Sequence, residues 1–336
     1  MILACDVGGT KTNVALFEQD GARLSLDRLV SFPSREHASL SEIVAAFLGG
    51  SRPKLHAAGF GIAGPVIGNR AETTNLPWEV DGRQLARELG LKRVSMLNDL
   101  EVQAWALPEL DASGQVQLQA GVPRPGNLAV IAAGTGLGMA ALLRGNGPVR
   151  SLASEGGHAG FAPDDEIEIE LLRVLQRQFG RVSAERVLSG AGLFRIYEFF
   201  RERDGEASPA WFTEALSHDD PAATVAHAAL DGRSAIAERA VLLFVRAFGS
   251  EAGNWALRTM ATGGVWLSGG IAHKLLVGPE GTSEEWRQRA REVLLAGFRN
   301  KGRLTPLVDE MPIHMITTDK APLMGAARFA LTEAGR

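Results

Sequence analysis

Two short segments rich in glycine and threonine have the composition of phosphate-binding turns. The first is Asp-Val-Gly-Gly-Thr-Lys-Thr at residues 6–12 and the second is Gly-Thr-Gly-Leu-Gly at residues 134–138. Adjacent glycines leave backbone N–H groups open to a phosphate, and Asp6 can hold Mg²⁺ directly or through water. Neither segment is a Walker A loop or a Rossmann fingerprint. Either alone could be a simple β-turn, but two such turns from two domains could clamp a nucleotide.

The pair Asn98-Asp99 ends a buried apolar run and precedes a helical pattern. An aspartate at the carboxyl end of a strand can point into a cleft and take the proton of a hydroxyl that attacks phosphorus. An aspartate directly before a helix is also a good N-cap. These residues alone leave both interpretations open.

Further polar positions could bind hydroxyl groups. Glu155 and His158 stand three residues apart among glycines, Glu185 follows about thirty residues later, and Asn75 belongs to an Asn-Leu-Pro-Trp turn. Each also has a purely structural interpretation, as a loop histidine, a helix-surface glutamate or part of a bare turn. A metal site is less expected here, because no third His or Cys lies near.

Short apolar runs predict the strands that place the glycine turns. Residues 2–5 and 13–17 predict a β-hairpin, and residues 128–133 and 139–143 predict a second hairpin of the same form. Two such hairpins predict a duplicated architecture with a cleft between its halves. The other elements expected in the first half are strands at 28–32, 57–62 and 94–97 and helices at 40–48, 80–88 and 100–107.

The second half is expected to be mainly helical. Residues 111–126 and 204–220 are expected as loops, and the domain boundary is placed in the first of them. Apolar spacing predicts helices at 166–179, 191–203, 234–259 and 322–332, a helix from about Ile271, and strands within 263–271 and at 313–317.

Composition narrows the classes of function. The 336 residues suffice for two domains. A net charge of −4 without a basic block argues against a nucleic-acid or membrane-surface partner, and no apolar run approaches the roughly 18 residues of a membrane span. Cys5 is the single cysteine, which excludes an internal disulfide and a cysteine zinc site. A reducing compartment fits this composition, and we expect a cytoplasmic protein.

Taken together, these segments resemble the bacterial glucokinase family of the hexokinase–actin-like superfamily, from Asp6–Thr12 to the Ala-Pro-Leu-Met-Gly-Ala-Ala run at 321–327. The resemblance implies an α/β fold of the two-domain actin-like ATPase (ribonuclease H-like) type, with a duplicated mixed-sheet core and an interdomain cleft. It implies a small domain at 1–110, completed by a C-terminal helix at 319–336, and a large domain at 111–318. No cysteine-rich zinc motif follows His158, so the resemblance is to the zinc-free glucokinases.

The implied activity is phosphorylation of glucose at its 6-hydroxyl by ATP with Mg²⁺, in a homodimer. Asp99 would be the catalytic base, and Gly269 and Gly270 would lie near the adenosine. The sugar would contact Asn75, Asn98, Asp99, Glu155, His158 and Glu185. The phosphates would be held by Asp6, Val7, Gly8, Gly9, Thr10, Lys11, Thr12, Gly134, Thr135 and Gly136.

Three other functions fit parts of the pattern. A kinase for fructose, mannose or an N-acetylhexosamine would share the same chemistry. A sugar-sensing repressor would need a DNA-binding helix pair, whereas the first hairpin begins at residue 2. An actin- or chaperone-like ATPase would hydrolyse ATP without a sugar, and it gives no reason for Glu155, His158 and Glu185 to occur together.

Overall fold

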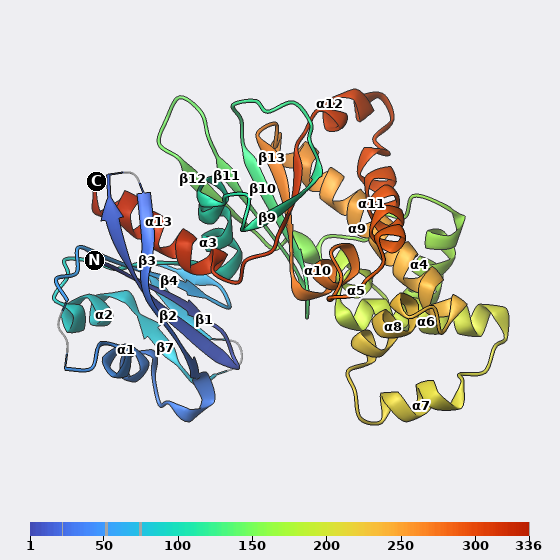
Figure 1. Ribbon diagram of the computed structural model, residues 1–336, viewed down its shortest axis with the longest axis horizontal. Coiled ribbons are helices and arrows are strands. Elements are labelled where there is room, and N and C mark those ends of the chain that lie inside the picture. Colours follow the sequence, from blue (N-terminus) through green and yellow to red (C-terminus); the bar gives the residue numbers. More distant parts are fainter. Residues whose placement is uncertain (22, 51–52, 74–75, 336) are drawn as a thin grey trace.

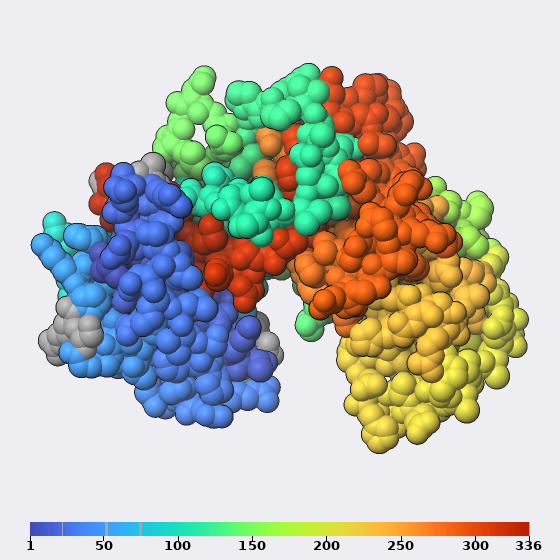
Figure 2. Space-filling view, in the orientation of Figure 1, coloured from blue at the N-terminus to red at the C-terminus, as the bar shows by residue number. Residues whose placement is uncertain are grey.

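The computed structural model describes residues 1–21, 23–50, 53–73 and 76–335. These residues form two lobes, each built on a mixed β-sheet (Figure 1). A deep hollow separates the N-terminal lobe, blue in Figure 2, from the helical part of the second lobe, yellow and orange. The predicted α/β architecture, with a duplicated mixed-sheet core and a cleft between the halves, is confirmed.

The sheet of the first lobe has the order β3-β2-β1-β4-β8. Its strands are β1 (Ile2–Val7), β2 (Lys11–Asp20), β3 (Arg23–Pro33), β4 (Ala57–Ile62) and β8 (Ser95–Asn98). The hairpin predicted around the first glycine turn is β1 and β2, and β1, β4 and β8 run parallel. Their carboxyl ends therefore meet at one edge of the sheet.

Two helices and a small second sheet complete this lobe. They are α1 (Leu40–Leu48), α2 (Gly82–Leu89), β5 (Val66–Ile67), β6 (Arg70–Glu72) and β7 (Glu79–Asp81). The helix expected at 80–88 begins only at Gly82, because Val80 belongs to β7 and Asp81 caps the helix by accepting a 2.7 Å bond from the N–H of Arg83. Gly90, at φ 66°, ends the helix as expected.

The sheet of the second lobe has the order β12-β11-β10-β13-β14-β9. Its strands are β9 (Gln115–Gln119), β10 (Leu128–Ala133), β11 (Leu137–Leu143), β12 (Arg150–Ser154), β13 (Gly264–Ser268) and β14 (Ile313–Ile316). β10 and β11 form the second predicted hairpin, and β10, β13 and β14 run parallel. This pattern of hairpin plus parallel strands repeats that of the first sheet.

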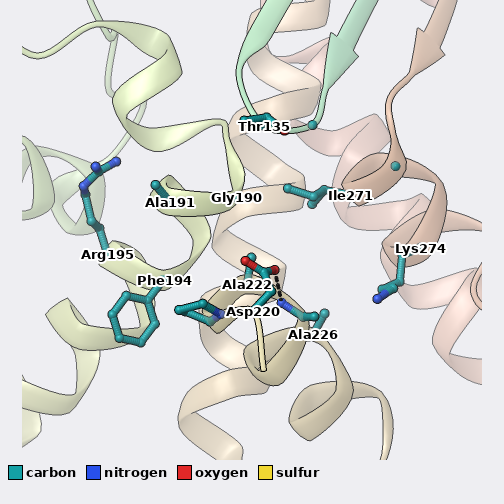
Figure 3. Close-up of a pocket in the computed structure, with 14 residues that line it drawn as sticks. Thr135, Gly190, Ala191, Phe194, Arg195, Asp220, Ala222, Ala226, Ile271 and Lys274 are labelled. Atoms are coloured by element: carbon teal, nitrogen blue, oxygen red, sulfur yellow. Dashed lines mark hydrogen bonds between the residues drawn. The ribbon is translucent and has the colours of Figure 1, made fainter. Parts of the chain in front are cut away.

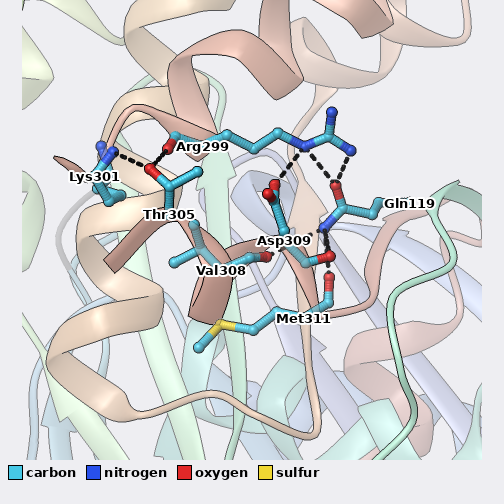
Figure 4. A network of polar contacts seen from close by, with 7 residues as sticks. All are labelled: Gln119, Arg299, Lys301, Thr305, Val308, Asp309 and Met311. Carbon is cyan, nitrogen blue, oxygen red and sulfur yellow. Dashed lines mark hydrogen bonds and ion pairs between the residues drawn. The ribbon is translucent and has the colours of Figure 1, made fainter. Parts of the chain in front are cut away.

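The prediction of a loop over 111–126 is wrong for Gln115–Gln119, which form the edge strand β9. The buried side chain of Gln119 fixes this strand (Figure 4). Its Nε2 donates to the carbonyl of Met311 at 2.8 Å, and its Oε1 accepts from Nη2 of Arg299 at 2.6 Å. These partners lie almost 200 residues along the chain, so the local sequence does not reveal the strand.

A group of helices gathers beside the large sheet, and only some of them pack directly on it (Figure 1). They are α4 (Glu166–Phe179), α5 (Ala184–Val187), α6 (Gly190–Asp204), α7 (Ala210–Leu216), α8 (Pro221–Leu230), α9 (Ala235–Thr259), α10 (Gly270–Leu276), α11 (Glu284–Arg299) and α12 (Thr305–Asp309). Short 3-10 turns lie at Ser34–Glu36, Leu107–Glu109, Gly156–His158 and Gly302–Leu304. No helix in the part of the chain that the structure describes combines the length and the apolar character needed to cross a membrane.

The prediction of a loop over 204–220 is wrong for α7. The ring of Phe212 in α7 is fully buried and stacks on Tyr197 of α6, with 4.4 Å between ring centroids. Burying one large aromatic side chain stabilises a fold by roughly 1.5–3 kcal/mol. This tertiary contact is sufficient to hold a helix in a segment whose sequence is largely polar.

Two helices, α3 (Asp99–Ala106) and α13 (Ala321–Ala334), lie between the two sheets (Figure 1). Val102 of α3 packs with α13 against the first sheet, whereas Trp105 packs against the second sheet. The division into 1–110 with 319–336 and 111–318 stays a prediction. The packing of α13 on β1 and β4 is compatible with it.

Candidate active site

Asp6 and Asp99 stand at the same edge of the first sheet. Asp6 lies near the end of β1, and Asp99 directly follows β8, two strands away. The charge of Asp6 is one of the causes that raise the pKa of Asp99. The two carboxylates are therefore close enough to interact, as the strand topology predicts.

Asp6 is held in place by a short chain of hydrogen bonds. Ser31 donates to Oδ1 of Asn13 at 2.6 Å, and Nδ2 of Asn13 donates to Oδ2 of Asp6 at 3.2 Å. Burial raises the pKa of Asp6, while the bond from Asn13 and the charge of Lys11 oppose the rise. A carboxylate that is disfavoured as a bare charge is well suited to a cation partner.

Asn98, rather than Asp99, is the N-cap of α3. Its Oδ1 accepts a 2.9 Å bond from the N–H of Leu100, and its Nδ2 donates to the carbonyl of Gly64 at 3.1 Å. Both ends of the Asn98 amide thus shape the turn between β8 and α3. Its contact with a sugar stays a prediction.

Asp99 is the first residue of α3 and is half-buried. Burial raises its pKa to about 6, and the charge of Asp6 adds to the rise, while the N–H of Leu100, 2.9 Å from Oδ1, opposes it. A base is most effective when its pKa lies near the working pH. Asp99 can thus accept a proton near neutrality, which an ordinary surface aspartate does poorly.

The first glycine turn joins β1 to β2. Thr10 and Lys11 are exposed at its tip, and the N–H of Gly8 donates to the carbonyl of Lys11 at 3.1 Å. Thr12 corrects a prediction, because it is fully buried and its hydroxyl is bonded to that of Ser34 at 2.9 Å. Its hydroxyl holds the turn in shape and is not exposed to a phosphate.

Ser34 holds the first glycine turn in shape through several hydrogen bonds. Its hydroxyl donates to the carbonyl of Gly8 at 2.7 Å, and its N–H donates to the carbonyl of Thr10 at 3.0 Å. The sequence analysis missed this residue, as it missed Asn13 and Ser31. A polar residue that follows an apolar strand is a weak signal, since most such residues are simply exposed.

The second glycine turn joins β10 to β11, and Glu185 contacts it. Oε2 of Glu185 accepts a 3.0 Å bond from the N–H of Leu137. A Cβ added at Gly136 would lie 2.6 Å from the same oxygen. Glu185 is half-buried at the start of α5, so the interpretation of it as a helix-surface residue is wrong.

The segment with Glu155 and His158 lies beside the segment that leads into α5. The N–H of Ala184 donates to the carbonyl of Ala159 at 2.8 Å, and Nη2 of Arg181 donates to the carbonyl of His158 at 2.7 Å. Glu155 and His158 are exposed, at the two ends of a 3-10 turn. The structure thus brings these two residues into the neighbourhood of Glu185, from which about thirty residues separate them in sequence.

A cavity of about 850 Å³ opens below the second glycine turn (Figure 3). Gly134 and Thr135 form one wall, and Gly270 forms another. The remaining walls come from α6, α8 and α10 and their N-terminal ends, and are lined by Gly190, Ala191, Phe194, Arg195, Asp220, Pro221, Ala222, Ala223, Ala226, Ile271 and Lys274. The sequence analysis identified only the glycine turns, because the other walls come from separate helices and share no local motif.

Gly269 is held at φ +95°, a conformation that favours glycine. A Cβ at this position would lie 2.1 Å from the carbonyl oxygen of Ala133. Gly269 therefore lets the start of α10 approach the end of β10. This approach brings Gly270 and the second glycine turn to the same cavity.

A family model described as glucokinase matches residues 3–333. The chain belongs to the glucokinase family. The glucokinase of Nostoc punctiforme is 37% identical to it, with 98% of each chain covered, and that of Photorhabdus laumondii is 33% identical, with 97% of this chain and 96% of the relative covered. The crystal structure of a glucokinase from an Antarctic psychrotroph has a TM-score of 0.86 at 28% identity, with 98% of each chain covered. The predicted two-domain actin-like ATPase fold is thereby confirmed.

Asn75 lies outside the described residues. Among the residues that are described, no group of three or more His, Cys, Asp or Glu side chains is arranged to hold a metal ion.

Proposed function

We propose that the cleft phosphorylates glucose at its 6-hydroxyl with ATP, giving glucose 6-phosphate and ADP. The observation that carries the proposal is Asp99, a half-buried carboxylate with a pKa of about 6 that directly follows β8, at the edge of the first sheet where β1 also ends. The glucokinase relatives, which match this chain over almost its whole length, support glucose as the substrate.

In this proposal the adenosine of ATP occupies the cavity beside Gly270. Its phosphates extend to the two glycine turns, where the backbone N–H groups of Gly9 and Gly136 and the exposed Lys11 can meet them. Catalysis of phosphoryl transfer depends on positioning and on stabilisation of charge. Two turns from opposite lobes supply both when the cleft closes.

Asp99 acts as the general base. Its carboxylate accepts the proton of the 6-hydroxyl as that oxygen bonds to the γ-phosphorus and the bond to the β-phosphate oxygen breaks. The proton goes to Asp99 and the electron pair goes to ADP. A positioned base is typically worth ~10²–10⁴ in rate.

The proposed magnesium partner is Asp6. Its carboxylate is an oxygen ligand of the kind Mg²⁺ prefers. Asn13 bonds to its Oδ2, and we assign Oδ1 to the cation or its water. Bound there with the phosphates, Mg²⁺ would neutralise their charge. Lys11, whose charge already acts on Asp6, would assist from the tip of the turn.

The sugar hydroxyls are assigned to Glu155, His158 and Glu185, which belong to the second lobe, and to Asn98 of the first. Asn75, which lies outside the described residues, is assigned to the sugar by the family resemblance alone. A site that pairs a substrate hydroxyl rejects an analogue without it, since the protein groups are then left unpaired. Closure of the two lobes would also exclude water and limit hydrolysis of ATP. A homodimer, implied by the family resemblance, and a cytoplasmic location, expected from the composition, belong to the same proposal.

A coupled assay of ADP release with a panel of hexoses tests this function. Glucose, mannose, fructose and N-acetylglucosamine are compared with ATP and Mg²⁺, and a reaction without sugar is the control. We expect the highest kcat/KM for glucose and little ADP without sugar. Equal ADP release without sugar, or a higher kcat/KM for another hexose, would contradict the proposal.

A further inference from the structure

One side-chain hydrogen bond joins α3 to the strand that leads into the cavity. Oγ of Ser268 donates to Oε1 of Gln103 at 2.9 Å, across 165 residues of sequence. Both side chains are half-buried. The bond spans the junction between the two lobes, because Gln103 belongs to α3 and Ser268 is the last residue of β13.

Ser268 stands beside two segments that the proposed function assigns to the nucleotide, the second glycine turn and the pair Gly269-Gly270. It is followed directly by Gly269 and Gly270, the latter of which lines the cavity. In the parallel pairing of β13 with β10, Ser268 is level with Ala132, two residues before Gly134. The position of Ser268 is thus fixed relative to both segments.

Gln103 stands one helical turn beyond Asp99 on α3. Residues four apart lie on the same face of a helix, so Gln103 and Asp99 share one face. The same helix meets the second lobe at Leu100, which is so close to Gly138 that an added Cβ would lie 2.7 Å from Leu100 Cδ2. The helix that carries Asp99 is therefore in contact with the second glycine turn as well.

We propose that Gln103 is a positioning residue for phosphoryl transfer, which acts through its bond with Ser268. This inference rests on the proposed function. The bond ties the helix of the base to the turns that hold the phosphates, and it thereby sets the distance between the attacking hydroxyl and the γ-phosphorus in the closed cleft. An error of about 1 Å in such a distance can cost ~10²-fold in rate.

The chain offers a matched control. Oγ of Ser151 donates to Oε1 of Glu101 at 2.7 Å, and this is also a bond from a serine of the second sheet to α3. Ser151 belongs to the outer strand β12 and does not line the cavity. Loss of the bond between Ser151 and Glu101 should weaken the attachment of α3 to the second sheet but should not change the alignment of α3 with the nucleotide.

The test compares Gln103→Leu, Ser268→Ala, Ser268→Thr, the double variant Gln103→Leu/Ser268→Ala and the control Ser151→Ala in steady-state glucose phosphorylation, with melting temperatures measured in parallel. We expect Gln103→Leu and Ser268→Ala each to lower kcat by about 10- to 100-fold with KM for glucose within about threefold. The double variant should lose no more than either single one. Ser268→Thr, which keeps the hydroxyl, and Ser151→Ala should stay within about twofold of the wild type.

Three results would overturn the inference. They are an unchanged kcat in Gln103→Leu, an equal loss of kcat in Ser151→Ala, and additive losses in the double variant. A loss confined to the Ser268 variants, with a raised KM for ATP, would show that Ser268 contacts ATP directly. In each of these outcomes the wild type still phosphorylates glucose. If the proposed function itself were wrong, the wild type would not phosphorylate glucose.

Discussion

The carboxylate of Glu185 accepts a 3.0 Å hydrogen bond from the backbone N–H of Leu137, at the base of the second glycine turn. Glu185 is assigned to the sugar and the turn to the phosphates. A group shared by two ligand sites couples their affinities, and the coupling is reciprocal. Glucose binding and nucleotide binding are therefore expected to depend on each other through this residue.

Substitution of Glu185 should separate its two roles. Glu185→Gln keeps an oxygen that can accept from Leu137, so we expect it to weaken glucose binding by roughly 10- to 100-fold, the range for loss of a charged hydrogen bond, and to spare ATP. Glu185→Ala also leaves the Leu137 N–H unpaired, and both ligands should bind more weakly. Calorimetric titration with each ligand measures these effects.

His158→Ala is the control for this pair. The backbone of His158 bonds to Glu155 through its N–H and to Arg181 through its carbonyl, and the residue is exposed. This variant should weaken glucose binding and leave ATP binding within about twofold. Equal effects of Glu185→Gln on glucose and ATP would contradict the assignment.

The second glycine turn offers a comparison of two alanine variants. A Cβ at Gly136 would lie 2.6 Å from Oε2 of Glu185, whereas a Cβ at Gly134 would meet no heavy atom within 4 Å. Gly136→Ala should displace the Glu185 carboxylate and weaken glucose binding even without nucleotide. Gly134→Ala should leave that binding unchanged and raise only KM for ATP. Identical behaviour of the two variants would exclude Glu185 as the cause.

The glycine turns and their strands could be predicted from sequence, because both depend on local composition. What surrounds them could not. Thr12 reads as one more phosphate ligand until its burial against Ser34 is seen, and nothing near residue 119 predicts its bonds to Arg299 and Met311.

The pair Asn98-Asp99 could be predicted only in part from the sequence. Its sequence predicts both a helix cap and a catalytic carboxylate, and the structure gives the cap to Asn98. Oδ1 of Asp99 accepts a bond from the N–H of Leu100, and its raised pKa comes from burial and from the charge of Asp6. Burial by distant elements is the property that the local sequence lacks.

The activity should depend on pH through Asp99. Because its pKa is raised to about 6 and the base must be unprotonated, log kcat/KM for glucose should be flat near pH 8 and fall with unit slope below about pH 6. Measurement in mixed buffers of constant ionic strength tests this. A limb centred near pH 4 would show that Asp99 titrates as an ordinary aspartate.

The raised pKa of Asp99 should also make the stability of the folded protein depend on pH. The folded state binds the Asp99 proton more tightly than the unfolded state, where the pKa is the ordinary 3.8. The contribution of Asp99 to the free energy of unfolding is therefore fully present below about pH 4 and is lost as the pH rises through about 6. Asp99→Asn should melt higher than the wild type at pH 8, with the difference shrinking toward pH 4.5.

Asp111→Asn is the opposite control for that measurement. The hydroxyl and the N–H of Ser113 lower the pKa of Asp111, so its loss should not stabilise the protein at pH 8. Melting curves of both variants at the two pH values make the comparison. An Asp99→Asn variant that is less stable than the wild type at both pH values would contradict the expected direction of the effect of Asp99 on stability.

The turnover of Asp99→Asn tests the central claim most directly. The variant keeps an oxygen that can accept from Leu100 and loses only the basic carboxylate. With glucose affinity measured by calorimetry on the same preparation, we predict unchanged sugar binding and a loss in kcat of at least ~10²-fold. Retention of more than about a tenth of wild-type turnover would contradict the role of Asp99 as the base, because a positioned base contributes ~10² or more.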